Sequence, residues 1–94
     1  MLTIKAHAHT FVSRDTKHLS VMALVWNEQG DVVTSLALPY INHKPVSDDG
    51  FTIVSLFRSF AYGIEALTKE KPMIDPEIDD PFKMRDFLVA EYEK

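Results

Sequence analysis

Two histidines near the start of the chain have the spacing that points most directly to chemistry. His7 and His9 are separated by one residue, so on an extended strand both imidazoles project from one face, about 6 to 7 Å apart at the backbone. Imidazoles at that separation can converge on one zinc ion or a similar cation, with His18 or His43 as a third ligand. The alternative is that both histidines lie on the solvent face of an edge strand together with Lys5. A His-x-His metal-binding protein is therefore the third of three functional hypotheses.

A basic and aromatic cluster surrounds the same histidines and supports a second hypothesis. Strand faces with such residues bind single-stranded nucleic acid through base stacking and phosphate contacts. The candidate residues are Lys5, His7, His9, Phe11, Arg14 and Lys17. The net charge of −4 opposes contact with a phosphate backbone over the rest of the chain. A nucleic-acid-binding regulator is therefore the alternative function and not the preferred one.

Acidic side chains gather just before the last apolar segment. Prolines at positions 72, 76 and 81 keep this connector extended and its carboxylates in solvent. Exposed acids favour fast encounter with a basic surface, and nearby aromatic residues can supply buried anchors. The predicted partner-binding residues are Asp75, Glu77, Asp79, Asp80, Phe82, Phe87 and Tyr92. The other interpretation is that Asp79 and Asp80 only cap the last helix and that the remaining acids aid solubility.

No residue pattern predicts a catalytic centre. The chain contains no cysteine, no G-x-S-x-G nucleophile elbow and no glycine-rich phosphate loop. Two pairs of adjacent acids, at positions 48–49 and 79–80, precede expected helices, where capping and the helix dipole explain them. We therefore expect a protein that is not an enzyme and needs no cofactor.

Three strands are expected in the first half of the chain. Alternating apolar and polar residues predict a half-buried strand from about Leu2 to Val12, followed by a polar connection over residues 13–17. A second strand from His18 to Trp26 is apolar on both faces and belongs in the centre of a sheet. The third strand ends at Pro39.

The turn Asn27-Glu28-Gln29-Gly30 predicts a hairpin between the second and third strands, closed by a G1 bulge. In the expected register three pairs share one face and two share the other. These pairs are Trp26 with Val32, Leu24 with Thr34 and Met22 with Leu36, then Val25 with Val33 and Val21 with Ala37.

Two helices are expected in the second half. Apolar residues at three- and four-residue steps predict a helix from Phe51 to Lys69, with Gly63 as a point of close approach to the sheet. Lys71 to Asp80 is an extended connector, and Asp80 caps a last helix from Pro81 to about Glu93. The predicted fold class is α+β: a three-stranded antiparallel sheet, in the order β-β-β-α-α, with both helices packed on it.

Length and composition predict one globular domain, residues 1–94. Hydrophobic residues make up 46% of the chain and charged residues 26%, both close to globular averages. The first ten residues lack the basic start and apolar run of a secretory signal. The longest uncharged run, residues 32–43, is shorter than the ~18 residues that a membrane helix needs. We expect a cytoplasmic protein with no membrane contact.

Parts of the chain resemble two known families in element order only. The stretch ALVWNEQGDVV, residues 23–33, resembles the opening hairpin of the Nudix hydrolases, but the glutamate-rich metal-binding box of those enzymes is absent. Three strands followed by a helix are similar to the first half of an RNase H-like fold. The strand-one aspartate of its active members is missing, and position 7 or 9 offers histidine instead. Neither resemblance implies catalytic activity.

Taken together, these features favour a small non-catalytic regulator, an inhibitor or adaptor that binds a protein partner through the acidic connector and the apolar last helix. Short, acidic, cysteine-free α+β chains without enzyme motifs are similar in class to phage and mobile-element regulators. A homodimer is also expected, because two short helices can cover both apolar faces of the central strand only if they separate. If both helices pack on the face of Met22, Leu24 and Leu36, a second copy would close the opposite face, formed by Val21, Ala23, Val25, Val33 and Ala37.

Overall fold

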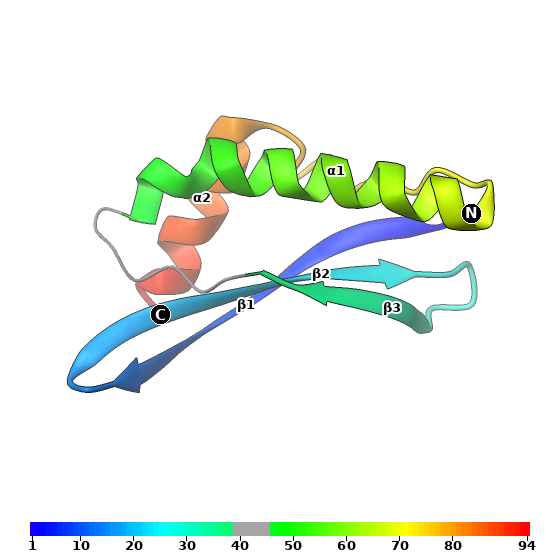
Figure 1. Ribbon diagram of the computed structural model, residues 1–94. Helices are drawn as coiled ribbons and strands as arrows, with labels where there is room; N and C mark the ends of the chain where they lie inside the picture. Colours follow the sequence, from blue (N-terminus) through cyan, green and yellow to red (C-terminus); the bar gives the residue numbers. More distant parts are fainter. Residues whose placement is uncertain (39–45) are drawn as a thin grey trace.

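A twisted sheet with two helices on one of its faces forms the structure (Figure 1). The computed structural model describes residues 1–38 and 46–94. Along the chain the elements are β1 (Thr3–Ser13), β2 (Thr16–Trp26), β3 (Val32–Ala37), the 3-10 helix η1 (Val46–Asp49), α1 (Gly50–Thr68), β4 (Met73–Ile74) and α2 (Pro81–Tyr92). The predicted α+β class with two helices is confirmed. The predicted end of the third strand, Pro39, lies outside the described residues.

The sheet has four strands in the order β3-β2-β1-β4, so the prediction of three antiparallel strands was wrong. β1 pairs antiparallel with β2, and β2 with β3, whereas β4 lies parallel to β1 with Ile4 opposite Ile74. The backbone N–H of Met73 donates to the Leu2 oxygen at 3.0 Å, and that of Asp75 donates to the Ile4 oxygen at 2.9 Å. The prolines of the connector exclude a helix, but these residues between Pro72 and Pro76 keep the N–H groups that a strand needs.

The β1–β2 hairpin turns more tightly than predicted. Only Arg14 and Asp15 lie between the strands, with φ angles of 52° and 61°. Two consecutive left-handed residues are the geometry of a two-residue turn whose twist matches that of the strands. β2 therefore begins at Thr16 and not at His18, and the hairpin is longer than expected.

The predicted β2–β3 hairpin is present, but most of its predicted register was wrong. The Asn27 side chain accepts hydrogen bonds from the backbone N–H groups of Gln29 and Asp31 at 3.0 and 2.9 Å, and Gly30 adopts a φ of 84°. Trp26 lies opposite Val32 as expected. A bulge between Val25 and Trp26 then shifts every later pair by one residue: Val25 with Thr34, Leu24 with Ser35, Ala23 with Leu36 and Met22 with Ala37.

The helices cover the face of β2 that carries the smaller side chains. Leu19, Val21, Ala23 and Val25 are fully buried there. They pack in one core with residues of both helices and the connector: Ile53, Val54, Phe57, Ala61, Ile64, Ile78, Met84 and Leu88. Large residues on α1 fit over small residues on the strand, as close packing requires. The homodimer prediction assumed that both helices pack on the opposite face of β2. In the structure they cover the Val21 face, which is therefore not available to a second copy.

Two glycines differ in role from what the sequence suggested. A Cβ atom at Gly50 would lie 2.6 Å from the carbonyl oxygen of Pro81 and 3.0 Å from the backbone nitrogen of Arg85, whereas one at Gly63 would meet nothing within 4 Å. Gly50, at the first residue of α1, is therefore the point of close approach, and it lies against α2. The prediction that Gly63 contacts the sheet was wrong.

Both helices have ends close to those predicted. At α1 the N-cap residue is Asp49, whose side chain makes no capping bond, and the C-cap residue is Lys69 with a left-handed φ of 64°. α2 begins with Pro81 at its first turn and Asp80 at its N-cap, as predicted. Among the described residues, neither helix is long and apolar enough to cross a membrane.

Candidate functional site

The acidic connector, residues 71–80, is held by bonds within the molecule. The carboxylate of Asp80 accepts hydrogen bonds from two backbone N–H groups in the first turn of α2, at 2.8 and 3.1 Å. Asp79 accepts a hydrogen bond from Arg58 Nε at 3.0 Å, and Arg58 Nη2 donates to the Asp79 backbone oxygen at 3.3 Å. Capping is therefore confirmed for Asp80, whereas Asp79 ties the connector to α1.

The other two predicted acids, Asp75 and Glu77, differ in whether their carboxylates form hydrogen bonds within the molecule. The Asp75 carboxylate accepts a hydrogen bond from the backbone N–H of Glu77 at 3.0 Å, which closes a local turn. Ile78 follows this turn and is buried in the core. The Glu77 carboxylate is exposed and makes no hydrogen bond or ion pair with any residue that the structure describes. Glu77 thus keeps the capacity to meet a partner that Asp79 and Asp80 have largely lost.

The three aromatic residues predicted to bind a partner occupy different surroundings. Phe82 is 67% exposed, and the guanidinium carbon of Arg85 lies 5.3 Å from the centre of its ring. Phe87 is half-buried against the core. Tyr92 is also half-buried, with the ammonium of Lys17 4.6 Å from its ring centre. Only Phe82 presents most of its ring to solvent.

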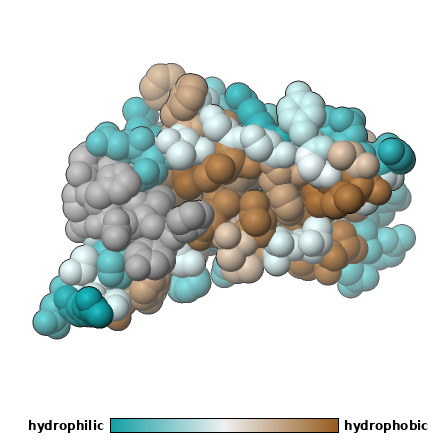
Figure 2. All heavy atoms as spheres, in the orientation of Figure 1, coloured by the Kyte–Doolittle hydropathy of each residue, from teal (hydrophilic) through white to brown (hydrophobic). Residues whose placement is uncertain are grey.

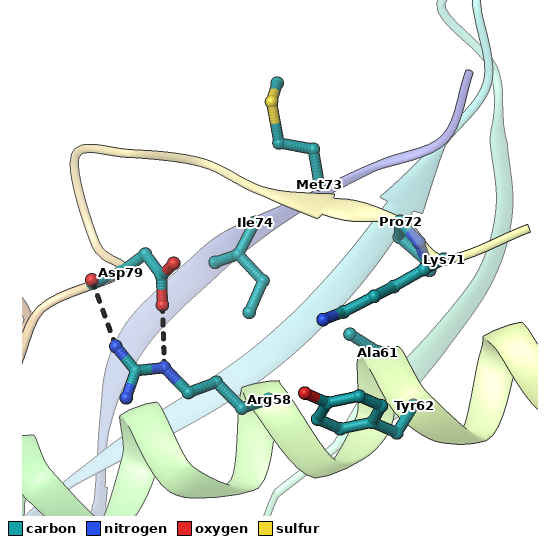
Figure 3. Close-up of a pocket in the computed structure, with 8 residues that line it drawn as sticks. All are labelled: Arg58, Ala61, Tyr62, Lys71, Pro72, Met73, Ile74 and Asp79. Atoms are coloured by element: carbon teal, nitrogen blue, oxygen red, sulfur yellow. Dashed lines mark hydrogen bonds and ion pairs between the residues drawn. The ribbon is translucent and has the colours of Figure 1, made fainter.

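An open cavity of about 410 Å³ lies between one flank of α1 and β4 (Figure 3). Its walls are Arg58, Ala61, Tyr62, Lys71, Pro72, Met73, Ile74 and Asp79. The Lys71 ammonium lies 4.2 Å from the ring centre of Tyr62, and Arg58 is bound to Asp79 at the other end. The cavity offers the Lys71 ammonium and the Tyr62 phenol to an anionic group, whereas the charge of Arg58 is neutralised by Asp79. Among its walls there is no nucleophile with a base beside it.

The sheet face opposite the helices brings four of the predicted basic and aromatic residues into a row. The ring centres of His7 and His9 lie 6.3 Å apart, and those of His9 and Phe11 lie 6.4 Å apart. Trp26 on β2 shares this face, and the Lys5 ammonium lies 5.9 Å from its ring centre. This face therefore carries a second aromatic platform that the sequence-based prediction did not include.

Two predicted nucleic-acid residues do not belong to that row. Arg14 lies in the turn at the end of the hairpin. Lys17 pairs with Val12, which places both side chains on the helix-covered face, and the Lys17 ammonium lies beside Tyr92. The sequence-based prediction assigned both to one patch because it had no register for the first hairpin.

The histidine pair has the expected spacing but no further ligand near it in the described part of the chain. His18 lies opposite Phe11, with ring centres 5.1 Å apart, and His43 lies outside the described residues. Within residues 1–38 and 46–94, no group of three or more His, Asp or Glu side chains is arranged to hold a metal ion. The metal hypothesis thus receives no support from the described geometry.

The sequence-based prediction also missed two exposed surfaces. Phe51, next to the contact of Gly50 with α2, is 71% exposed. The sequence predicts a helix that begins at Phe51 but does not predict a binding surface there. The signal in the sequence was a large aromatic residue in the first turn, outside the apolar stripe of that helix. All six residues of β3 are exposed, and this could not be foreseen, because the position of β3 at an edge follows only from the strand order.

Comparisons of the chain with models of protein families, with curated proteins and with solved structures find no match.

Proposed function

We propose that this chain is a small non-catalytic regulator that binds a protein partner at the start of α2 and the connector beside it. The observation that carries the proposal is Phe82, whose ring is 67% exposed at the start of a helix. Aromatic residues, phenylalanine among them, are enriched in the buried cores of protein interfaces.

The backbone around Phe82 is held in place before any partner arrives. Pro81 restricts the first helical position, and Asp80 caps the turn. The bonds from Arg58 to Asp79 attach the preceding residue to α1. A preorganised anchor loses little conformational entropy on binding, so more of its buried area contributes to affinity.

The charge around this anchor favours a basic partner surface. Residues 75–86 contain five acids and two basic residues. Glu77 and Asp86 are exposed; Asp86 forms an ion pair with Arg85, whereas Glu77 has no partner among the described residues. Charges of this kind raise the association rate more than the affinity, whereas Phe82 would determine the dissociation rate.

Substitution of Phe82 tests the proposal. Immobilised wild-type protein is used to capture partners from cells of its source, and the captured protein is then measured against purified variants. We expect Phe82→Ala to weaken binding at least 10-fold without loss of fold, because its ring is mostly in solvent. Val12→Ala is the control, since Val12 is 72% exposed at the far end of the hairpin. Equal binding by the two variants, or no captured protein sensitive to Phe82, would reject the proposed surface.

A double variant tests the role of charge. Changing Asp75 and Glu77 to serine removes two negative charges, while serine at position 75 can still accept the local hydrogen bond. We expect slower association and a weaker salt dependence with an unchanged dissociation rate. Unchanged association would show that the carboxylates of Asp75 and Glu77 play no part in the encounter with the partner.

The open sheet face supports a second candidate function, binding of single-stranded nucleic acid. The specific observation is the pair formed by Lys5 and Trp26 beside the ring row of His7, His9 and Phe11. Stacking platforms next to a cation are the elements that such binding requires.

Labelled 20-nucleotide single strands of thymidine and of uridine test this candidate. We expect binding that weakens with salt, and Lys5→Ser should reduce the salt slope by about 1. Lys17→Ser is the control, because Lys17 lies on the opposite face. Equal losses in both variants, or no binding at low salt, would exclude the open face as a nucleic-acid site.

A further inference from the structure

The β3 strand is an exposed edge with the features that favour strand pairing. All six of its residues are exposed, and residues 32–38 contain neither a charge nor a proline. Natural edge strands that avoid pairing usually carry charges, prolines or bulges that turn them away. The bulge here lies at the start of β3, beside Trp26, and leaves the rest of the strand regular.

The backbone groups available on this edge follow from the ladder pattern. Leu38 donates its N–H to the Val21 oxygen at 3.0 Å. Because antiparallel ladder bonds alternate along a strand, Leu36 and Thr34 also point their backbone groups toward β2. Ser35 and Ala37 then point theirs outward, and no described residue forms a hydrogen bond with them.

The flank of α1 on the β3 side is apolar and uncharged. The two charged residues of α1, Arg58 and Glu65, lie on the other flank, where Arg58 meets the connector beside β4. β3 and β4 are opposite edges of the sheet, so the β3 side of α1 carries Leu56, Phe60, Gly63 and Leu67, at steps of three and four residues. Leu67 is 83% exposed, and Figure 2 shows a hydrophobic band between α1 and the β3 edge.

We propose that a second copy of this chain docks on this surface, with the two β3 strands paired antiparallel about a two-fold axis and the two α1 flanks beside each other. The sheets would then continue across the interface. A charged partner surface would gain no ion pair here, since this surface offers it no opposite charge. The occupant needs its own free strand edge beside an uncharged apolar helix flank, and this chain supplies both. Such a self-complementary patch is what a two-fold interface requires.

The size of the surface predicts a weak dimer. A six-residue strand is about 20 Å long, and the molecule measures 43 × 23 × 20 Å. The strand length and the shortest dimension of the molecule are both about 20 Å, so the side formed by β3 and α1 has an area of about 400 Å² per copy. Standard interfaces bury ~800 Å² per partner. Dimerisation should accordingly depend on concentration in the micromolar range.

Analytical ultracentrifugation over a concentration series tests the proposal. We expect the mass to rise from 10.7 kDa toward twice that value as concentration increases from about 1 µM to about 1 mM. Amide exchange measured by NMR should slow at Ser35 and Ala37 at the high concentration, and only there. A monomer at every concentration would overturn the proposal.

Matched lysine variants locate the interface. Ser35→Lys puts two like charges near the two-fold axis and should weaken the dimer at least 10-fold. Ser13→Lys makes the same change in the first hairpin and should leave it intact. Gly63→Glu tests the helix flank, where an added Cβ atom meets nothing within 4 Å in a single copy. A dimer that survives both Ser35→Lys and Gly63→Glu would overturn the proposed surface. None of these substitutions alters Phe82, so this result is independent of the proposed function.

Discussion

Gly50 determines how closely α1 and α2 can approach. Its missing side chain leaves room for the carbonyl oxygen of Pro81 and for Arg85, whereas Gly63 faces open space. The sequence shows that both are glycines within or next to a helix. It does not show which has a neighbour, because that depends on the crossing of two helices that are far apart in the chain.

The two glycines should respond in opposite directions to the same change. Gly50→Ala should lower the free energy of unfolding by about 1 to 3 kcal/mol, because backbone atoms must move. Gly63→Ala should raise it by about 0.5 to 1 kcal/mol, since alanine favours helix and meets no obstacle. Urea unfolding of both variants measures these values. Destabilisation by Gly63→Ala would mean that something covers that flank of α1, as a second copy would.

At the scale of elements, periodic patterns predicted the long segments and failed for the short strand β4. The long strands, α1 and α2 were all expected within a few residues of their observed ends. β4 was not, because Met73 and Ile74 are too few to show a period and their partner β1 lies at the other end of the chain. The hairpin register was wrong because a bulge adds one residue, and no residue type marks a bulge within Val32-Val33.

The cap of α2 is the element-level feature that mutation can test most directly. Asp80→Ala should lower the free energy of unfolding by about 1 kcal/mol, since two backbone N–H groups lose their acceptor. Asp80→Asn keeps an acceptor and should restore most of the loss. Asp79→Ala should have a smaller effect than Asp80→Ala, because its ion pair with Arg58 is partly exposed to solvent. Thermal unfolding ranks the three variants, and an equal effect of Asp80→Asn and Asp80→Ala would contradict the cap.

At the scale of the whole molecule, both helices lie on one side of the sheet. β2 is apolar on both faces, so its sequence could not identify the covered face, and the homodimer prediction chose the wrong one. The candidate sites were affected in the same way. Lys5, His7, His9 and Phe11 share the open face because they alternate along one strand, but the proximity of Lys5 to Trp26 and the separation of the row from Lys17 depend on pairing between strands.

Two leucines on β2 provide a measure of how open the second face is. Leu19 is fully buried in the core, whereas Leu24 is half-buried on the open face. Leu19→Ala should cost about 2 to 5 kcal/mol of stability, the range for a buried leucine. Leu24→Ala should cost less than half as much in dilute protein. Urea unfolding compares the two variants, and equal losses would show that another layer covers the open face.

The position of β1 between β2 and β4 has a consequence for the order of folding. Its pairing with β2 needs only a two-residue turn, and hairpins form in about 1 to 10 µs. Its pairing with β4 joins residue 3 to residue 73, so nearly the whole chain must be closed into a loop first. We expect the hairpins to be present in the folding transition state and β4 to be absent from it. In stopped-flow experiments, Ile74→Ala should therefore speed unfolding with little change in the folding rate, whereas Ala23→Gly should slow folding. During synthesis, one edge of β1 would remain unpaired until residue 74 leaves the ribosome, which makes the nascent chain a candidate for chaperone binding.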